Sequence, residues 1–401
     1  MRRLMVSACV ISALIASADS TFAQKKYDPG ASDTEIKIGN IVPYSGGASA
    51  YATIAKVQAA YFRMLNEGGG INGRKINYVS YDDGFSPPKT VEQARKLVEN
   101  DEVLLVLSPH GTATNGAIHK YMNAKKVPHL FLTSGASKWS DPANFPWTMG
   151  FLNNYQSEAK IYAQYILATN PNAKIGVIYQ NDDFGKDYLT GLRKGLGDRA
   201  KQIVAEIPFE FTTPTVDPMI ASLKATDPDV VLHISTPKFV AQGIRRIAEM
   251  GWKPVQIIPN TAVSVDGVLR PAGLENAQGV LGASYMKDPT DPELADDPAV
   301  KEWRAFMDKW YPEGSKADSF NVYGYIVAQV AVQLLKQCGD DLTRDSIMKQ
   351  AANLDMTSGL LLPGIRVKTG PDDYLPLEQM RMMRFKGQSW EYFGDLLSTQ
   401  R

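Results

Sequence analysis

The chain has 401 residues, which is enough for two domains of ordinary size. Its 43 lysine and arginine residues balance 43 aspartate and glutamate residues, so the charge argues against nucleic acid or an anionic membrane surface as a partner. Two cysteines occur in the whole sequence, Cys9 and Cys338.

Residues 1–23 have the composition of a secretory signal peptide. Basic residues precede an apolar run over residues 4–18, and a small-residue cleavage site ends at Ala23. The run is too short to span a bilayer as a helix. We therefore expect a cleaved signal, a soluble periplasmic product and a mature chain that begins near Gln24. Because Cys9 lies in the signal, the mature chain would keep one cysteine and form no internal disulfide.

Hydrophobic spacing predicts alternating strands and helices after the signal. A strand is expected over residues 35–42, and the apolar positions of residues 54–65 fall on one face of a helix. Glycines 68–70 end that helix, since glycine accepts the left-handed conformation that helix caps need. The next strand covers residues 75–81, and the next helix covers residues 87–100.

The most informative segment follows that helix. An apolar run over residues 102–107 is stopped by a turn rich in hydroxyl groups, residues 108–115, which opens a helical segment. A second apolar run, residues 127–132, ends on the turn 133–137. This order predicts a strand–helix–strand unit with parallel strands, whose carboxyl ends line a ligand crevice. Both turns should face one cleft and suit a carboxylate or another small polar group.

The same pattern recurs later in the chain. A strand over residues 229–234 is followed by the turn 235–237, a helix over 239–250, a strand over 255–258 and the turn 259–261. The two stretches agree in order, length and the Ser/Thr-Pro after the first strand. We interpret them as two similar lobes that face each other, with chance similarity between two such units as the alternative.

The remaining elements complete an α/β fold of two Rossmann-like lobes with parallel-rich sheets. Three crossovers, at residues 150–155, 279–286 and 359–364, should form a hinge of short segments that allows closure around a ligand. Further helices are expected over 157–169, 217–224, 299–310 and 320–336, and further strands over 174–179 and 203–209. The expected lobes are residues 34–150 with 287–358, and residues 151–286 with 359–401.

Catalytic and metal-binding patterns are missing from the sequence. The four histidines, at positions 110, 119, 129 and 233, do not pair with one another or with cysteine or glutamate at zinc spacing. The sequence also lacks a nucleophile elbow and a phosphate-binding loop. A serine–histidine pair at His110 is conceivable, but the turn residues suffice for binding. We therefore predict a protein that is not an enzyme and has no cofactor or metal.

Three short segments resemble a known family. They are Asn66-Glu67-Gly68-Gly69-Gly70-Ile71-Asn72-Gly73, then Tyr81-Asp82-Asp83, and the turn 132–137. In this order they resemble the leucine/isoleucine/valine-type periplasmic binding proteins, the type I solute receptors of ABC importers. The resemblance implies a receptor that closes its two lobes on a small molecule and delivers it to an ABC permease. The signal and the single mature cysteine, Cys338, lead us to expect a soluble monomer. The family's disulfide would join the positions of Phe85 and Gly111, and neither is cysteine here.

The resemblance also implies a ligand pocket. In amino-acid-binding members, the positions of Thr112 and Ser137 hold the ligand carboxylate, and an aromatic residue at the position of Phe184 stacks on the ligand. The position of Thr261 carries a glutamate that pairs with the ligand's ammonium group. The ligand-binding residues predicted on this basis are Tyr51, Thr112, Gly135, Ser137, Phe184, Thr236, Thr261 and Tyr285.

The threonine at position 261 bears on the nature of the ligand. A buried ammonium group without an anionic partner is costly, so the ligand could be an aromatic or aliphatic carboxylate instead of an α-amino acid. Asp182 or Asp183 could instead supply the charge. Two other classes of function stay open. They are an exported sensing domain for a membrane receptor, disfavoured by the lack of an anchor, and an exported hydrolase, disfavoured by the lack of catalytic residues.

Overall fold

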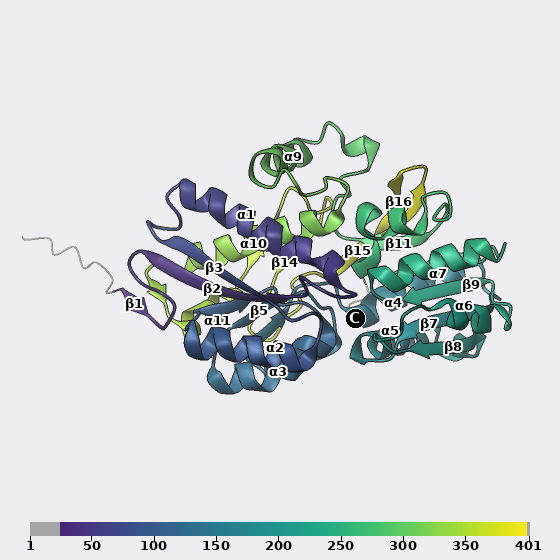
Figure 1. Ribbon diagram of the computed structural model, residues 1–401, viewed down its shortest axis with the longest axis horizontal. Helices are drawn as coiled ribbons and strands as arrows, with labels where there is room; N and C mark the ends of the chain where they lie inside the picture. Colours follow the sequence, from purple (N-terminus) through teal and green to yellow (C-terminus); the bar gives the residue numbers. More distant parts are fainter. Residues whose placement is uncertain (1–24, 399–401) are drawn as a thin grey trace, which may run out of the picture.

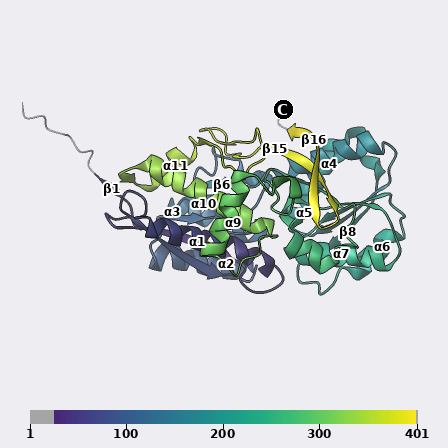
Figure 2. The same ribbon diagram turned by 90° about the horizontal axis from the view of Figure 1, so that it is seen from above.

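The computed structural model describes residues 25–398. The expected signal, residues 1–23, and the expected mature start at Gln24 lie outside the described residues. Every helix within the described range is too short or too polar to span a bilayer. Two lobes lie side by side along the long axis of the molecule, with α1 (Ala52–Glu67) in one and α7 (Pro237–Glu249) in the other (Figures 1 and 2).

Lobe one is built on a five-stranded sheet whose neighbouring strands are all parallel. The eight-residue strand β2 pairs with β3 along its whole length, and the buried faces of these strands supply much of the core. The strand order is β3-β2-β4-β5-β6, with bounds β2 Glu35–Val42, β3 Lys75–Asp82, β4 Leu105–Leu107, β5 His129–Leu132 and β6 Thr148–Gly150.

Helices cover both faces of this sheet (Figure 1). α2 and α3 lie on one face, where Leu97 and Ile118 join a common apolar core. α1 and α10 lie on the other face, and Gly324 of α10 lets the backbones approach closely, because a Cβ there would lie 2.3 Å from Val57. The helices of this lobe are α2 Pro87–Arg95, continued by a π turn Lys96–Asn100, α3 Thr112–Lys125, α9 Pro298–Trp310, α10 Ser319–Cys338 and α11 Arg344–Ala351.

Lobe two is built on a seven-stranded mixed sheet of order β16-β15-β11-β10-β9-β7-β8. Its first five strands in the chain are parallel, and the last two, β15 and β16, add an antiparallel edge. α4 and α5 pack on one face, and α6 and α7 pack on the other. The bounds are β7 Ile175–Gln180, β8 Ile203–Phe209, β9 Val230–Ile234, β10 Val255–Ile257, β11 Leu281–Ser284, β15 Gln379–Lys386, β16 Ser389–Ser398, α4 Tyr155–Thr169, α5 Asp183–Leu196, α6 Asp217–Lys224 and α8 Arg270–Ala272.

The predicted α/β fold with parallel-rich sheets is confirmed. The third crossover differs in position from the sequence prediction. Residues 359–364 run beside the second crossover, where Leu362 N donates to Tyr285 O at 2.9 Å. The chain then stays with lobe one, and Tyr374 Oη donates to Pro146 O at 3.1 Å, before Gln379 opens β15. Short strand pairs complete the fold: β1 Lys26–Tyr27 with β12 Asp341–Leu342, and β13 Asp355–Met356 with β14 Val367–Lys368.

Candidate functional site

Two adjoining narrow cavities lie between the lobes, where the carboxyl ends of the parallel strands meet. Four residues line both cavities: Tyr51, His110, Thr133 and Thr261. The cavity that includes the N-terminus of α3 is called the helix compartment, and its other lining residues are Phe85, Gly111, Thr112, Tyr155, Gln180, Phe184 and Thr236. The cavity beside the crossovers is called the hinge compartment, and its other lining residues are Ile54, Leu152, Asn260, Tyr285, Met286, Ser319, Phe320 and Tyr323.

Six of the eight predicted ligand-binding residues line these compartments, and two do not. Gly135 sits behind the wall, where a Cβ would lie 2.1 Å from Asn153 O and 2.8 Å from the ring of Tyr155. Ser137 lies outside the cavities, where its N and Oγ donate to Asp187 Oδ2 at 2.8 and 3.0 Å. Contact of any of the eight residues with a ligand stays a prediction.

The N-terminus of α3 forms one end of the helix compartment. Gly111 has a φ of +98°, a conformation open to glycine, and the helix begins at Thr112. The first N–H groups of a helix have no partner within it and carry partial positive charge, which suits a carboxylate. Thr112 Oγ1 lies 2.7 Å from Ser134 Oγ, which also accepts from Trp139 Nε1 at 2.8 Å. A hydroxyl group is thus held beside the free N–H groups.

Aromatic side chains form a wall along the two compartments, and Tyr51 and His110 line both of them. The rings of Tyr51 and His110 lie 3.9 Å apart between centroids, and Phe85 lies 6.0 Å beyond His110. Burial lowers the pKa of His110 to about 3, so this imidazole is neutral at physiological pH. On the lobe-two side, Phe184 and Tyr155 meet edge to face at 5.2 Å. The wall therefore offers flat apolar surfaces without a charge.

Buried polar atoms without a partner gather at these two compartments. Among the described residues, such atoms occur at eleven side chains, and six of these side chains line the cavities. Leaving a buried donor or acceptor unpaired costs about 1–3 kcal/mol, so six such atoms in one place indicate a site completed by a polar ligand. The six atoms are His110 Nδ1, Gln180 Oε1, Thr236 Oγ1, Thr261 Oγ1, Tyr285 Oη and Ser319 Oγ.

Neither compartment is lined by an aspartate, glutamate, lysine or arginine of the described chain. Asp182 caps α5 and accepts from Phe184 N at 3.0 Å, and Asp183 forms a 2.7 Å ion pair with Lys138. The carboxylate of Glu158 is buried and lies outside the lining of both compartments, and it accepts three hydrogen bonds from the protein, one of them from Tyr188 Oη at 2.8 Å. Neither aspartate therefore belongs to the lining of the compartments.

The lobes are closed on each other. Phe85 and Phe211 meet across the cleft with ring centroids 4.6 Å apart. The bonds of Ser137 to Asp187 and of Lys138 to Asp183 also join the lobes. A solute in the narrow compartments would therefore be enclosed, and its entry requires that these contacts open.

Several lining residues were missed by the sequence analysis. His110 and Thr133 lie in turns that the sequence singled out, and Gln180 is the last residue of β7, so their position at the end of a strand was a usable signal. Ser319 and Tyr323 come from α10, which returns to lobe one from the far end of the chain. No local pattern marks such residues, because the long-range packing of α10 against α1 brings them to the site.

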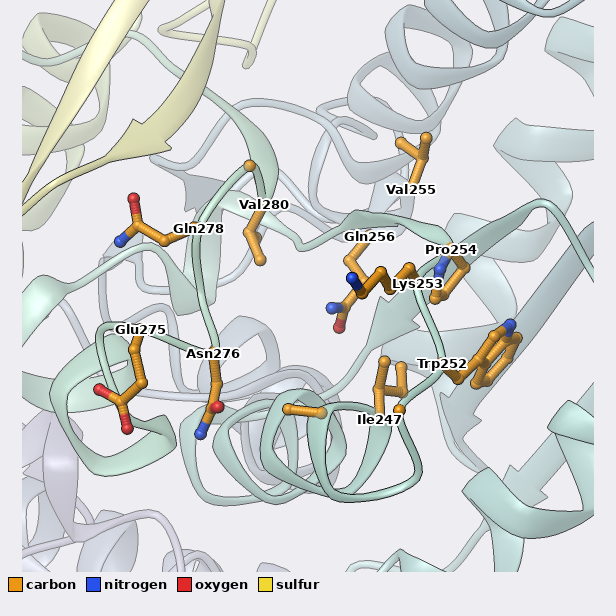
Figure 3. A pocket seen from close by; sticks show the side chains of 13 residues that line it. Ile247, Trp252, Lys253, Pro254, Val255, Gln256, Glu275, Asn276, Gln278 and Val280 are labelled. Atoms are coloured by element: carbon orange, nitrogen blue, oxygen red, sulfur yellow. The ribbon is translucent and has the colours of Figure 1, made fainter.

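A wider depression on the surface of lobe two lies at the starts of β10 and β11 (Figure 3). Trp252, Lys253 and Glu275 border it, and Gln256 Oε1 in its wall is already bonded to His233 at 3.0 Å. None of the buried unpartnered atoms in the described chain belongs to its lining. No cluster of three potential metal ligands occurs in residues 25–398. The compartments between the lobes are therefore the stronger candidate site.

Comparison with known proteins agrees with this geometry. The family described as "Periplasmic binding protein" matches residues 35–389. "Leu/Ile/Val-binding protein homolog 1" of Brucella abortus is 24% identical over 343 residues, covering 85% of this chain and 86% of that protein. A branched chain amino acid ABC transporter protein from Thermus thermophilus with bound valine superposes with a TM-score of 0.81 at 16% identity, covering 92% and 97% of the two chains. A fatty acid ABC transporter substrate-binding protein from Thermomonospora curvata gives a TM-score of 0.77 at 21% identity, covering 94% and 95%.

Proposed function

Because the chain belongs to the periplasmic binding protein family, of the branched-chain amino acid-binding type, we propose that it is the extracytoplasmic receptor of an ABC importer. It captures a small solute with a carboxylate group by closure of its two lobes and delivers that solute to a membrane permease. We also propose that it acts as a monomer in the periplasm after removal of residues 1–23. Intact mass and native size of the exported protein test that part directly.

One observation carries the proposal: six side chains with buried, unpartnered polar atoms line two narrow cavities between the lobes. A solute that meets these atoms removes their desolvation cost only when the lobes are closed, so binding and closure are coupled. The compartments offer no assembly of nucleophile and base, because His110 pairs with Tyr51 and not with a hydroxyl nucleophile. This arrangement supports a binding role over a catalytic one.

The charge of the site favours an acid without an α-ammonium group. The N-terminus of α3 and Thr112 suit a carboxylate, whereas no carboxylate of the described chain faces the compartments to receive an ammonium. The flat faces of Tyr51 and Phe184 suit a branched or aromatic body. The names of the structural relatives include both valine and fatty acid, and both of these carry a carboxylate.

The carboxylate can be tested with 4-methylpentanoate and its neutral carboxamide. We expect calorimetry to show the acid binding at least about tenfold tighter, since charge-assisted hydrogen bonds contribute roughly 1.5–3 kcal/mol each. Thr112→Ala should lower the affinity for the acid by about tenfold to a hundredfold and the affinity for the amide by less. Thr169→Ala, at an exposed hydroxyl of α4 bonded to Tyr165 O, is the matched control. Equal affinity for acid and amide would remove the carboxylate from the proposal.

A further inference from the structure

The hinge compartment contains unsatisfied hydroxyl groups at the end of the site remote from α3. Tyr285 is fully buried, Ser319 is 4% exposed, and neither hydroxyl has a partner among the described residues. The hydroxyl of Thr261, on the wall shared with the helix compartment, is also unpartnered. All three residues line this compartment.

The other polar groups in the same compartment are satisfied by the protein, with the exception of His110 Nδ1. Tyr323 Oη donates to Thr133 Oγ1 at 3.3 Å, and Thr133 Oγ1 lies 2.8 Å from Ser108 Oγ. Asn260 Nδ2 donates to Ala283 O at 2.8 Å. Most polar groups around this space thus have protein partners, whereas the hydroxyl groups of Tyr285, Ser319 and Thr261 have none among the described residues.

The open hydroxyl groups are held in place by their backbones. Ser319 is the first residue of α10, whose cap Asp318 accepts from Phe320 N at 2.9 Å and from Ser264 Oγ at 2.8 Å. Tyr285 lies in the second crossover, where its carbonyl accepts from Leu362 N at 2.9 Å. The backbones of Ser319 and Tyr285 are therefore fixed at the compartment, which preorganises both residues for a ligand.

The chemistry of the compartment defines what it can receive. Hydroxyl groups both donate and accept hydrogen bonds, and burial raises the pKa of Tyr285 well above its ordinary value, so its phenol stays neutral. No charged side chain of the described chain lines the compartment, and Ile54, Leu152 and Met286 supply apolar walls. The matching group is uncharged, able to hydrogen-bond, and carried on an apolar body.

We infer that the preferred solute has two polar ends: a carboxylate at the N-terminus of α3, and an uncharged hydroxyl or carbonyl group that meets Tyr285, Ser319 and Thr261 in the hinge compartment. This inference rests on the proposed function and narrows its substrate class to hydroxylated or oxo acids. A plain aliphatic or phenyl acid would leave the hinge hydroxyls buried and unpaired. A site built to bond a substrate hydroxyl rejects the analogue that lacks it.

Four compounds test the inference by calorimetry: 3-phenylpropanoate, its 3-hydroxyphenyl and 4-hydroxyphenyl analogues, and 4-ethylphenol, which lacks the carboxylate. We expect at least one hydroxylated acid to bind about tenfold tighter than 3-phenylpropanoate. In Ser319→Ala and Tyr285→Phe, this ratio should fall towards one. Ser222→Ala, at an exposed hydroxyl of α6 bonded to Pro218 O, should leave the ratio unchanged.

The outcomes separate the two proposals. If 3-phenylpropanoate binds and neither hydroxyl improves its affinity, or if the gain survives in both variants, the hinge inference is wrong and the carboxylate proposal stands. If 4-ethylphenol binds as tightly as its carboxylated analogue and loses affinity in both variants, the hinge inference stands and the carboxylate proposal is wrong. If none of the four compounds binds, the hinge inference is wrong, and the carboxylate proposal is decided by the comparison of 4-methylpentanoate with its carboxamide.

Discussion

The phenol of Tyr51 in lobe one donates a 2.8 Å hydrogen bond to the backbone carbonyl of Thr261 in lobe two. Both residues belong to the wall that the two compartments share. The bond exists only when the lobes are closed, and it lies against the space that a solute would occupy. Closure of the lobes and completion of the site are therefore one event.

Tyr51→Phe should weaken solute binding by roughly threefold to tenfold, because a neutral hydrogen bond contributes about 0.5–1.5 kcal/mol and this bond favours the closed form alone. The ring itself remains, so the packing against His110 and the midpoint of thermal unfolding should change little. Calorimetry and small-angle scattering of the same samples measure affinity and closure. An unchanged affinity would show that this bond does not contribute to closure.

Ser137 and Asp187 join the lobes outside the compartments, which predicts a general effect on binding. Asp187→Ala removes the acceptor of both Ser137 N and Ser137 Oγ. It should therefore lower the affinity for every solute more than Ser137→Ala does. The loss should appear as faster dissociation, measured by stopped-flow fluorescence. Asp227→Ala, in an exposed ion pair with Lys174 inside lobe two, is the control and should have no effect. A loss confined to carboxylate solutes would place Ser137 on the ligand instead.

Glu158 should make stability depend on pH near neutrality. Burial raises its pKa from 4.5 to about 7, although Tyr162, Tyr188 and the backbone of Asn260 donate to it. The folded protein then binds this proton more tightly than the unfolded chain does, so the stabilisation is fully present below about pH 4.5 and is lost as pH rises through about 7.

The decrease in the free energy of unfolding that is attributable to Glu158 is on the order of 1–3 kcal/mol between pH 5 and pH 8. All four histidines, at 110, 119, 129 and 233, are buried and have lowered pKa values that oppose this trend at acid pH, so the contribution of Glu158 must be isolated by comparison. Glu158→Gln should lose less stability than the wild type as pH rises, measured by urea unfolding. Parallel pH profiles for the two proteins would contradict this assignment.

Thr261→Glu should change the solute preference. A glutamate at this position would supply the counter-charge that an α-ammonium needs, so affinity for leucine should rise. The new carboxylate should also repel a plain acid, so affinity for 4-methylpentanoate should fall. Calorimetry with both solutes gives the ratio of affinities, and Thr261→Gln controls for side-chain volume. The prediction fails if glutamate and glutamine give the same ratio.

Local sequence patterns predict the fold and the parts of the site that lie directly after strands. The strand–turn–helix order around Thr112 and around Thr236 is local, so hydrophobic spacing and turn residues place both at the carboxyl ends of strands. Ser137 shows where this reasoning stops. A short 3-10 turn over Ser137–Trp139, held by the bond from Trp139 Nε1 to Ser134 Oγ, places Ser137 against Asp187 instead of the cavity. Hydrophobic periodicity in the sequence does not predict this contact between Ser137 and Asp187.

Long-range packing accounts for the other differences. Residues 365–378 stay with lobe one because β14 pairs with β13 and Thr369 Oγ1 donates to Ala351 O at 2.6 Å. These partners lie in a two-residue strand and a helix end, which carry no pattern in sequence. Ser319 reaches the hinge compartment for the same reason, since the position of α10 is set by its contact with α1.

The central claim is that the closed compartments hold a carboxylate solute without an α-ammonium group. The most direct test is a pair of calorimetric titrations of the wild-type protein, one with 4-methylpentanoate and one with leucine, which differ only in that group. Burial of an unpaired ammonium costs several kcal/mol, so we expect the acid to bind at least about a hundredfold tighter. Tighter binding of leucine would contradict this claim and would show that the protein is a receptor for amino acids.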